Sequence, residues 1–221
     1  MVVEREEGGV ITKLELFRLF SVFRDAYLIV TACFWGVLLI VCCFFMYIRC
    51  MASLIEYKGK APKIGERVFI AEGARLIGDV EIGDDSSVFY NAVLRADLAE
   101  IRVGQRSNIQ DNVTVHLSTG VGVHIGDDVI VGHNAVLHAC TIDNRVLIGM
   151  GAIVMDGAHI KSNCIVGAGA LVTQDKEFPE GSLIVGTPAH VVRSLTEDEI
   201  RKAQENAQHY LQIKDELLKG E

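Results

Sequence analysis

The chain has 221 residues and a formal net charge of −8 at pH 7, and half of its residues are hydrophobic. This length allows one well-buried domain with appended segments. An acidic chain without a stripe of lysine and arginine cannot neutralise a phosphate backbone, so nucleic acid is excluded as a partner.

Residues 27–48, YLIVTACFWGVLLIVCCFFMYI, form an uncharged N-terminal stretch of 22 residues. At 1.5 Å per residue, a helix of about this length crosses a hydrocarbon core of ~30 Å. The stretch exceeds the ~7–15-residue apolar core of a cleavable signal peptide. We therefore predict a single-pass transmembrane helix. Basic residues flank both of its ends, so the side of the membrane stays undetermined.

A second interpretation of the N-terminal region stays open. Met51 begins MASLIEYKGK, which resembles the start of a soluble domain, so residues 1–50 could be an over-extended gene model and the protein cytoplasmic. Both interpretations give the same domains: an extension at 1–50, a main domain at 51–195, and a helix at 196–219. Only two of the six cysteines, Cys140 and Cys164, lie outside the extension. This distribution does not form a disulfide framework and indicates a reducing compartment.

A six-residue repeat runs through residues 64–172. An aliphatic residue returns at every sixth position, apart from one slip, one loop and one deletion, at Ile64, Ile70, Leu76, Ile82, Val88, Leu94, Val103, Ile109, Val115, Ile125, Val131, Leu137, Ile142, Ile148, Val154, Ile160, Val166 and Val172. A helix repeats at 3.6 residues and a strand at 2, so neither alone explains this period. Short strands joined by regular turns do, if three of them complete one triangular coil. We predict a mainly β fold, a parallel β-helix of hexapeptide repeats.

Glycines often follow the aliphatic residue of a repeat, as Gly104 and Gly149 do. This placement suits either tight corners or close backbone approach. The chain then ends in a predicted helix, with Thr196 and Glu199 as a capping box and Gly220 as its end. Its apolar stripe, expected to pack along the coil, comprises Ile200, Ala203, Ala207, Tyr210, Leu211 and Leu218.

Three histidines are candidate metal ligands. His116 directly follows the inward Val115, and His138 directly follows the inward Leu137. Each of these aliphatic residues is the third of its coil, so both histidines point outward from one face, about one strand spacing of ~4.8 Å apart. Two imidazoles so placed can converge on one ion, with Zn–N bonds of about 2.0–2.1 Å.

The third histidine, His133, lies two positions after the middle aliphatic residue of its coil, Val131. It therefore belongs to another part of the triangle and should not reach the other two within one chain. It could reach a pair on a neighbouring copy around a threefold axis. This phase predicts a homotrimer with metal sites at the subunit interfaces.

Polar side chains gather around the same constellation. Arg95 shares the phase of His116, and Asp97 follows two residues later. Gln110 and Asp111 come just after an inward isoleucine on the face that leads into His116. A cation, an amide and two carboxylates are thus expected near the three histidines.

Five motifs follow one another in this region: VLRAD at 93–97, NIQDNVTVH at 108–116, VGHNAVLH at 131–138, IGMGAIVMDGA at 148–158 and VGTPAHVVR at 185–193. Together they resemble the gamma-class carbonic anhydrases, from about residue 63 to the C-terminus. Five ordered motifs within a matching repeat are far more specific than any single one. The resemblance implies a trimeric left-handed β-helix in which two histidines of one subunit and one of its neighbour bind the metal.

By position, the resemblance makes His116, His133 and His138 the ligands of Zn²⁺, with Fe²⁺ or Co²⁺ as alternatives. It further implies that Arg95 and Asp97 form an ion pair at the subunit interface. In the same way it places Gln110 beside metal-bound solvent, with Asp111 as its structural neighbour.

The implied activity is the reversible hydration of CO2 to bicarbonate by a metal-bound hydroxide at the trimer interface. The loop after the first ligand, LSTGVGV at 117–123, has no acid, whereas the best-characterised active members carry a glutamate proton shuttle in or near it. The turnover rate therefore stays open, with His124 and Tyr90 as alternative shuttles.

Two other functions stay open. The first is a hexapeptide acyltransferase or thioesterase, because the same coil hosts such enzymes and fold alone does not determine function. Acyltransferases normally use one catalytic histidine, so three in metal-binding phase count against it. The second is a non-catalytic trimeric scaffold, tethered to a membrane only if the segment 27–48 is expressed.

Overall fold

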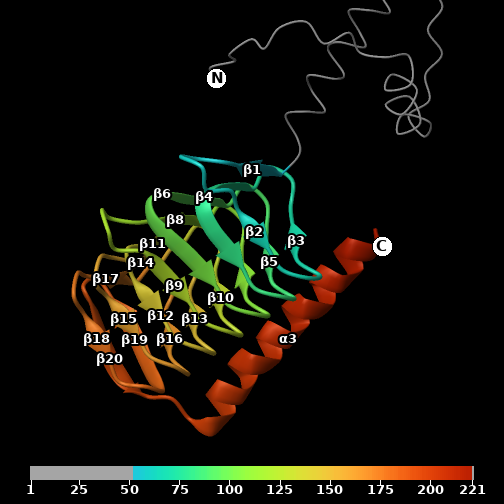
Figure 1. Cartoon of the computed structure of the whole chain (residues 1–221). Coiled ribbons are helices and arrows are strands. Elements are labelled where there is room, and N and C mark those ends of the chain that lie inside the picture. Colours follow the sequence, from blue (N-terminus) through green and yellow to red (C-terminus); the bar gives the residue numbers. More distant parts are fainter. Residues whose placement is uncertain (1–51, 221) are drawn as a thin grey trace, which may run out of the picture. The chain divides into compact units, whose positions relative to one another are not determined.

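In the computed structural model, which describes residues 52–220, the chain winds into a solenoid of short parallel strands flanked by one C-terminal helix (Figure 1). Consecutive strands lie on successive sides of the coil, and each strand pairs with strands of the coils before and after it. The coil therefore has three faces. β4 and β6 run through a corner and join two of these faces into one sheet.

The histidine face comprises β1 (Ser53–Ile55), the first halves of β4 (Arg75–Ile82) and β6 (Val93–Val103), β8 (Thr114–His116), β11 (Val136–His138), β14 (Ile153–Val154) and β17 (Leu171–Val172). The charged face comprises β2 (Lys63–Ile64), the second halves of β4 and β6, β9 (Val123–Ile125), β12 (Thr141–Ile142), β15 (His159–Ile160) and β18 (Glu177–Phe178). The helix face comprises β3 (Phe69–Ile70), β5 (Ser87–Val88), β7 (Asn108–Ile109), β10 (Ile130–Val131), β13 (Leu147–Ile148), β16 (Ile165–Val166), β19 (Ser182–Gly186) and the antiparallel β20 (Ala189–Ser194).

The core lies inside the coil and follows the six-residue repeat. All the predicted inward positions are buried except Ile64 and Ile70, which are partly buried at the N-terminal end. The same spacing continues to Phe178 and Ile184, which are also buried. The predicted repeat ends at Val172 because the aromatic Phe178 interrupts the aliphatic pattern, although its ring fills the same inward position.

Of the two roles predicted for the glycines after inward residues, close approach is the one observed. A Cβ added to Gly149 would lie 2.4 Å from the backbone nitrogen of Ala168 in the next coil. Left-handed backbone occurs elsewhere, mostly three residues after an inward residue, and one column of such non-glycine residues lies at the corner between the charged and helix faces. This column comprises Arg67, Asp85, Arg106, Asp128, Arg145 and Asn163, with φ between 52° and 59°.

The predicted C-terminal helix is confirmed as α3 (Glu197–Lys219), with Thr196 and Glu199 forming the capping box. α3 runs along the helix face (Figure 1), where the ring of Tyr210 meets that of Phe89 edge-on at 6.0 Å. Most of the predicted stripe is at least partly buried, but Leu218 is exposed. The sequence analysis missed the most buried side chain of the helix, Lys214, which is only 1% exposed.

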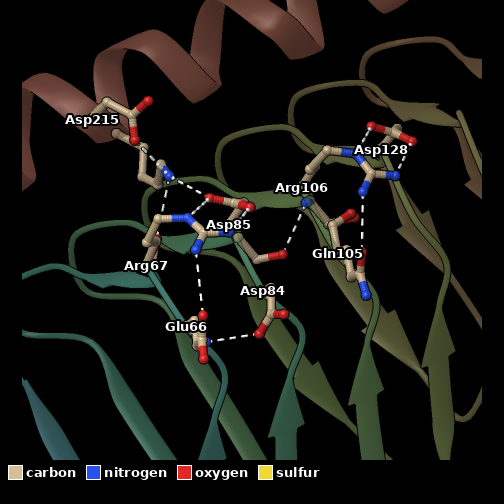
Figure 2. Close-up of polar contacts among 11 residues, drawn as sticks. Glu66, Arg67, Asp84, Asp85, Gln105, Arg106, Asp128 and Asp215 are labelled. Carbon is tan, nitrogen blue, oxygen red and sulfur yellow. Dashed lines mark hydrogen bonds and ion pairs between the residues drawn. The ribbon is translucent and has the colours of Figure 1, made fainter.

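Lys214 joins α3 to the corner column through its ammonium group. Its Nζ lies 2.7 Å from Asp215, 3.2 Å from Asp85 and 3.3 Å from the carbonyl oxygen of Arg67. Arg67 in turn donates two hydrogen bonds to Asp85, of 2.8 and 2.7 Å. Arg106 and Asp128 repeat this paired arrangement farther along the column (Figure 2). The helix is thus held by charge as well as by apolar packing.

Within residues 52–220, no helix is both long enough and apolar enough to cross a membrane. The predicted transmembrane segment 27–48 lies outside the described residues. The single-pass anchor and the cytoplasmic protein beginning at Met51 both stay predictions.

Candidate metal centre

The strands β8 and β11 place His116 and His138 side by side on the histidine face. The two residues are direct cross-strand partners, as their shared phase in the repeat predicts. The Nδ1 atom of His116 lies 3.2 Å from the Nε2 atom of His138, and both rings are partly exposed. The structure therefore brings together two of the three predicted ligands.

A carboxylate engages the other nitrogen of each ring. The Nε2 atom of His116 lies 3.0 Å from Asp97 Oδ1, and the Nδ1 atom of His138 lies 2.6 Å from Asp156 Oδ1. A neutral imidazole has one N–H donor and one lone-pair acceptor. Since a carboxylate accepts the N–H of each ring, the two nitrogens that face each other are left as lone pairs.

Two lone pairs 3.2 Å apart repel each other unless a proton or a metal cation lies between them. Two ligands on a tetrahedral ion, with Zn–N bonds of about 2.0–2.1 Å, are about 3.3 Å apart. The observed spacing matches this value. Carboxylates behind the ligating imidazoles are also the usual support of a metal site. The residues present therefore fit a divalent cation.

His133 lies in the turn after β10 and faces a different set of side chains. Its Nδ1 atom is 2.8 Å from Asp111 Oδ2, and its backbone N–H donates to Gln110 Oε1 at 3.1 Å. Among the described residues, no group of three histidine, cysteine or acidic side chains is close enough to hold an ion. His133 does not join the other two histidines within one chain, as its phase predicts, and its Nε2 atom points away from the bond to Asp111.

The four other predicted site residues fall into two groups. Arg95 forms an ion pair with Asp97, as the resemblance implies, and its place at a subunit interface stays a prediction. Burial alone raises the pKa of Asp97, but hydrogen bonds from His116 and the backbone, together with Arg95, hold this pKa below its usual value. Asp97 is therefore a carboxylate partner of a candidate ligand as well as a partner of Arg95.

Gln110 and Asp111 support the turn that carries His133. Gln110 is only 3% exposed, and its amide oxygen accepts a hydrogen bond from the backbone N–H of His133 in this turn. Asp111 Oδ1 accepts the backbone N–H of Tyr90 at 3.2 Å while Oδ2 meets the His133 ring. Both residues thus act on the third histidine and not directly on the other two.

The sequence analysis missed Asp156 and Ser118. The Ser118 hydroxyl donates to Asp156 Oδ2, and this bond lowers the pKa of Asp156 against the opposing effect of burial. Asp156 lies within the motif IGMGAIVMDGA, two residues after an inward valine of the coil that follows His138. That phase was the available signal, since it places the carboxylate one coil beyond the ligand.

Other potential ligands lie elsewhere or are chemically unsuited. Cys140 is buried in the core, and this burial raises the pKa of its thiol to about 12. His124 and His159 both lie on the charged face, paired with Glu100 at 3.5 Å and with Asp143 at 2.9 Å. His124 therefore points from a different face than His116 and His138 of the same chain, and the proton-shuttle role considered for it stays a prediction.

Family models confirm the repeat. The model described as "Bacterial transferase hexapeptide (six repeats)" matches residues 139–174, and "Hexapeptide repeat of succinyl-transferase" matches residues 101–139. Gamma carbonic anhydrase 2, mitochondrial, of Arabidopsis thaliana is 40% identical over 167 residues, which are 73% of this chain and 60% of that protein. The probable carbonic anhydrase of Methanocaldococcus jannaschii is 53% identical over 154 residues, which are 70% of this chain and 97% of that protein. The chain belongs to the gamma-class carbonic anhydrase family.

This family member is also similar to a solved structure described as a putative acetyltransferase from Bacillus cereus. The two are 40% identical, the match covers 74% of this chain and 95% of the other, and the TM-score is 0.73. The chain spans only 60% of the length of the Arabidopsis relative. The gamma-class carbonic anhydrase family and the parallel solenoid are therefore shown, whereas the names of these relatives differ in the chemistry that they indicate.

Proposed function

We propose that the protein hydrates carbon dioxide reversibly to bicarbonate as a metal-dependent homotrimer. The observation that carries the proposal is the pair of facing nitrogens of His116 and His138, 3.2 Å apart, each on a ring backed by a carboxylate. This pair occurs in a chain 53% identical to a probable carbonic anhydrase. The match in sequence supports the carbonic anhydrase activity, and the geometry of the two rings supports a metal ion at this site.

In this proposal His116 and His138 of one subunit and His133 of its neighbour hold Zn²⁺, with Fe²⁺ or Co²⁺ as alternatives. When bound, such a cation acidifies water and so supplies a nucleophile at neutral pH. Three ligands leave one tetrahedral position open for that chemistry. Gln110 orients the nucleophile or the substrate, while Asp97 and Asp111 fix the rings of His116 and His133.

The outward surface of the histidine face supports the trimer. Beside the two histidines runs an outward row that contains four apolar side chains, Val93, Val136, Ile153 and Leu171. Ile153 is 41% exposed, and an apolar row beside a polar site is typical of a protein–protein contact. A second copy that covers this row brings its own His133 to the pair. As in the gamma class, we take the coil to be left-handed.

Proton release limits the proposed reaction. Neither a carboxylate nor an imidazole lies in the loop 117–123, and the hydroxyl of Ser118 is held by Asp156. Tyr90, the other residue considered as a shuttle, is exposed at the corner that carries Asp111 and not in this loop. We therefore propose slow turnover that rises when a small buffer base accepts the proton.

A direct test combines metal analysis with measurement of CO2 hydration on the purified protein. We expect one Zn²⁺ per chain, and hydration that accelerates with added imidazole buffer. Metal without hydration would favour a scaffold. Acetyl transfer from an acyl carrier, without bound metal, would support the acyltransferase alternative that the Bacillus cereus relative suggests.

The shared site has a sharper test. His133→Ala and His138→Ala each remove one ligand from every site, so each homotrimer should lose its metal. Random mixing of the two variants by unfolding and refolding should restore about one quarter of the sites, because an intact His116–His138 pair then meets an intact His133 across some interfaces. A site built within a single chain would show no such recovery.

A further inference from the structure

A chain of three side chains leads from His138 to the loop after β8. The Nδ1 atom of His138 lies 2.6 Å from Asp156 Oδ1, and the Ser118 hydroxyl donates to the other oxygen, Oδ2. Ser118 and Asp156 are 38 residues apart in the sequence. Both carboxylate oxygens of Asp156 are thus engaged, one by the candidate ligand and one by the loop.

The loop holds Ser118 firmly on both sides. Its backbone N–H donates to the Val121 carbonyl at 3.2 Å, and the N–H of Val121 donates back to the Ser118 carbonyl at 3.1 Å. Leu117, the preceding residue, is buried in the core. A Cβ added to Gly122 would lie 2.4 Å from the Glu100 carbonyl oxygen, so the end of the loop sits directly against β6. The Ser118 hydroxyl is therefore a fixed donor.

The other end of this chain is fixed as well. Directly after Asp156, the backbone N–H of Gly157 donates to the Ala139 carbonyl at 2.8 Å, which ties the turn of Asp156 to the residue that follows His138. The carboxylate and the imidazole thus sit on adjacent, hydrogen-bonded coils. Rotation of the carboxylate is set by Ser118, and rotation of the imidazole is set by the carboxylate.

We propose that Asp156 and Ser118 are positioning residues that set the tautomer and orientation of His138 and thereby the metal affinity of the site. This inference rests on the proposed metal-dependent function. A carboxylate that accepts the Nδ1–H directs the Nε2 lone pair toward His116 and makes that nitrogen a stronger ligand. The loop 117–123, which has no acid, then serves to hold the carboxylate in place.

The charged face offers a matched control. Asp143 lies 2.9 Å from His159, so the same two residue types meet at a similar distance, and with similar exposure, away from the candidate site. Asp143→Asn changes the net charge by the same amount as Asp156→Asn. Any difference between the two variants therefore reports position and not charge.

The test measures Zn²⁺ and Co²⁺ affinity of the full-length protein by competition with a chelator, together with the visible absorption of the Co²⁺ form. We expect Asp156→Asn to weaken metal binding by about 10–100-fold and to shift the Co²⁺ spectrum. Ser118→Ala should weaken binding by about threefold, because the lost hydroxyl acts on His138 only through Asp156, whose bond to the imidazole remains. Ser118→Thr, which keeps the hydroxyl, should restore it, and Asp143→Asn should stay within about twofold of the unaltered protein.

Several outcomes would overturn the inference. One is unchanged affinity in both Asp156→Asn and Ser118→Ala, and another is an equal loss in Asp143→Asn. If Asp156→Asn does not fold, the contrast between Ser118→Ala and Ser118→Thr decides alone. Failure of the unaltered protein to bind either metal would refute the proposed function itself, whereas tight binding with insensitive variants would refute only the roles of Asp156 and Ser118.

Discussion

The histidine face and the charged face share one inward pattern and differ completely outside. On both, from Leu76 to Phe178, the inward side chains are buried and, apart from Phe178, aliphatic, and the strands are parallel. The outward row of the histidine face contains four aliphatic side chains beside His116 and His138. The outward row of the charged face reads Lys63, Glu81, Arg102, His124, Thr141, His159 and Glu177.

This difference separates what folds the chain from what gives it a function. Inward residues determine the coil, because on both of these faces they are the side chains that folding of a single chain removes from water. Outward residues are free to vary, so one row can suit a second subunit and another can suit solvent. Histidines occur on both faces, but only His116 and His138 turn their nitrogens toward each other. A histidine in this fold thus acquires its role from the neighbours in its row.

The largest expected effect is on metal binding. We predict that His116→Gln lowers the affinity for Zn²⁺ by more than about 100-fold, because one of three ligands is lost and the facing nitrogen of His138 has no partner. The matched change on the charged face, His124→Gln, should leave the affinity within about twofold. Metal content after dialysis against a chelator measures both. Equal losses would break the distinction between the two faces.

The next effect is on assembly. Ile153→Glu places a charge in the apolar row of the histidine face, and burying it against a second copy would cost several kcal/mol per interface. We expect this variant to sediment as a monomer at micromolar concentration. Thr141→Glu, in the outward row of the charged face, should leave the trimer intact. Sedimentation velocity distinguishes the two, and a trimeric Ile153→Glu protein would place the interface elsewhere.

The helix face differs from both of these faces, because α3 of the same chain packs against it. Lys214→Ala removes the buried ammonium group from Asp85 and Asp215, although Arg67 still pairs with Asp85. We expect a loss of about 2–3 kcal/mol in the free energy of unfolding. Lys202→Ala removes an exposed pair with Asp198 on the same helix and should cost less than about 0.5 kcal/mol. Urea unfolding at fixed protein concentration measures both.

The smallest effect concerns pH at the corner that anchors α3. Hydrogen bonds from Arg67, and then from Lys214, lower the pKa of Asp85 to about 2 in spite of burial. Because the folded pKa lies below the unfolded value, this stabilisation is complete above about pH 4 and is lost as the pH falls toward 2. Asp85→Asn suits the same left-handed backbone and lacks the titrating group. The stability difference between the two proteins should shrink by about 1 kcal/mol between pH 5 and pH 2.5.

Local patterns predicted much of the fold and part of the site. The period of six predicted the coil and its inward residues, and the capping box predicted the start of α3. The shared phase of His116 and His138 predicted their pairing, which the register of β8 and β11 confirms. Such features follow from sequence because spacing along a regular coil translates directly into position in space.

Contacts between segments that are far apart in the sequence could be identified only from the structure. Ser118 and Asp156 are 38 residues apart, and Lys214 and Asp85 are 129 residues apart. The six-residue repeat does not predict such contacts. The shape of the loop, the twist of the strands and the position of the helix on the coil determine which outward side chains meet. The sequence alone therefore determined the triangular coil and the phase of its histidines. Only the tertiary structure decided which carboxylate holds each imidazole, since hydrogen bonds depend on distance and angle and not on order along the chain.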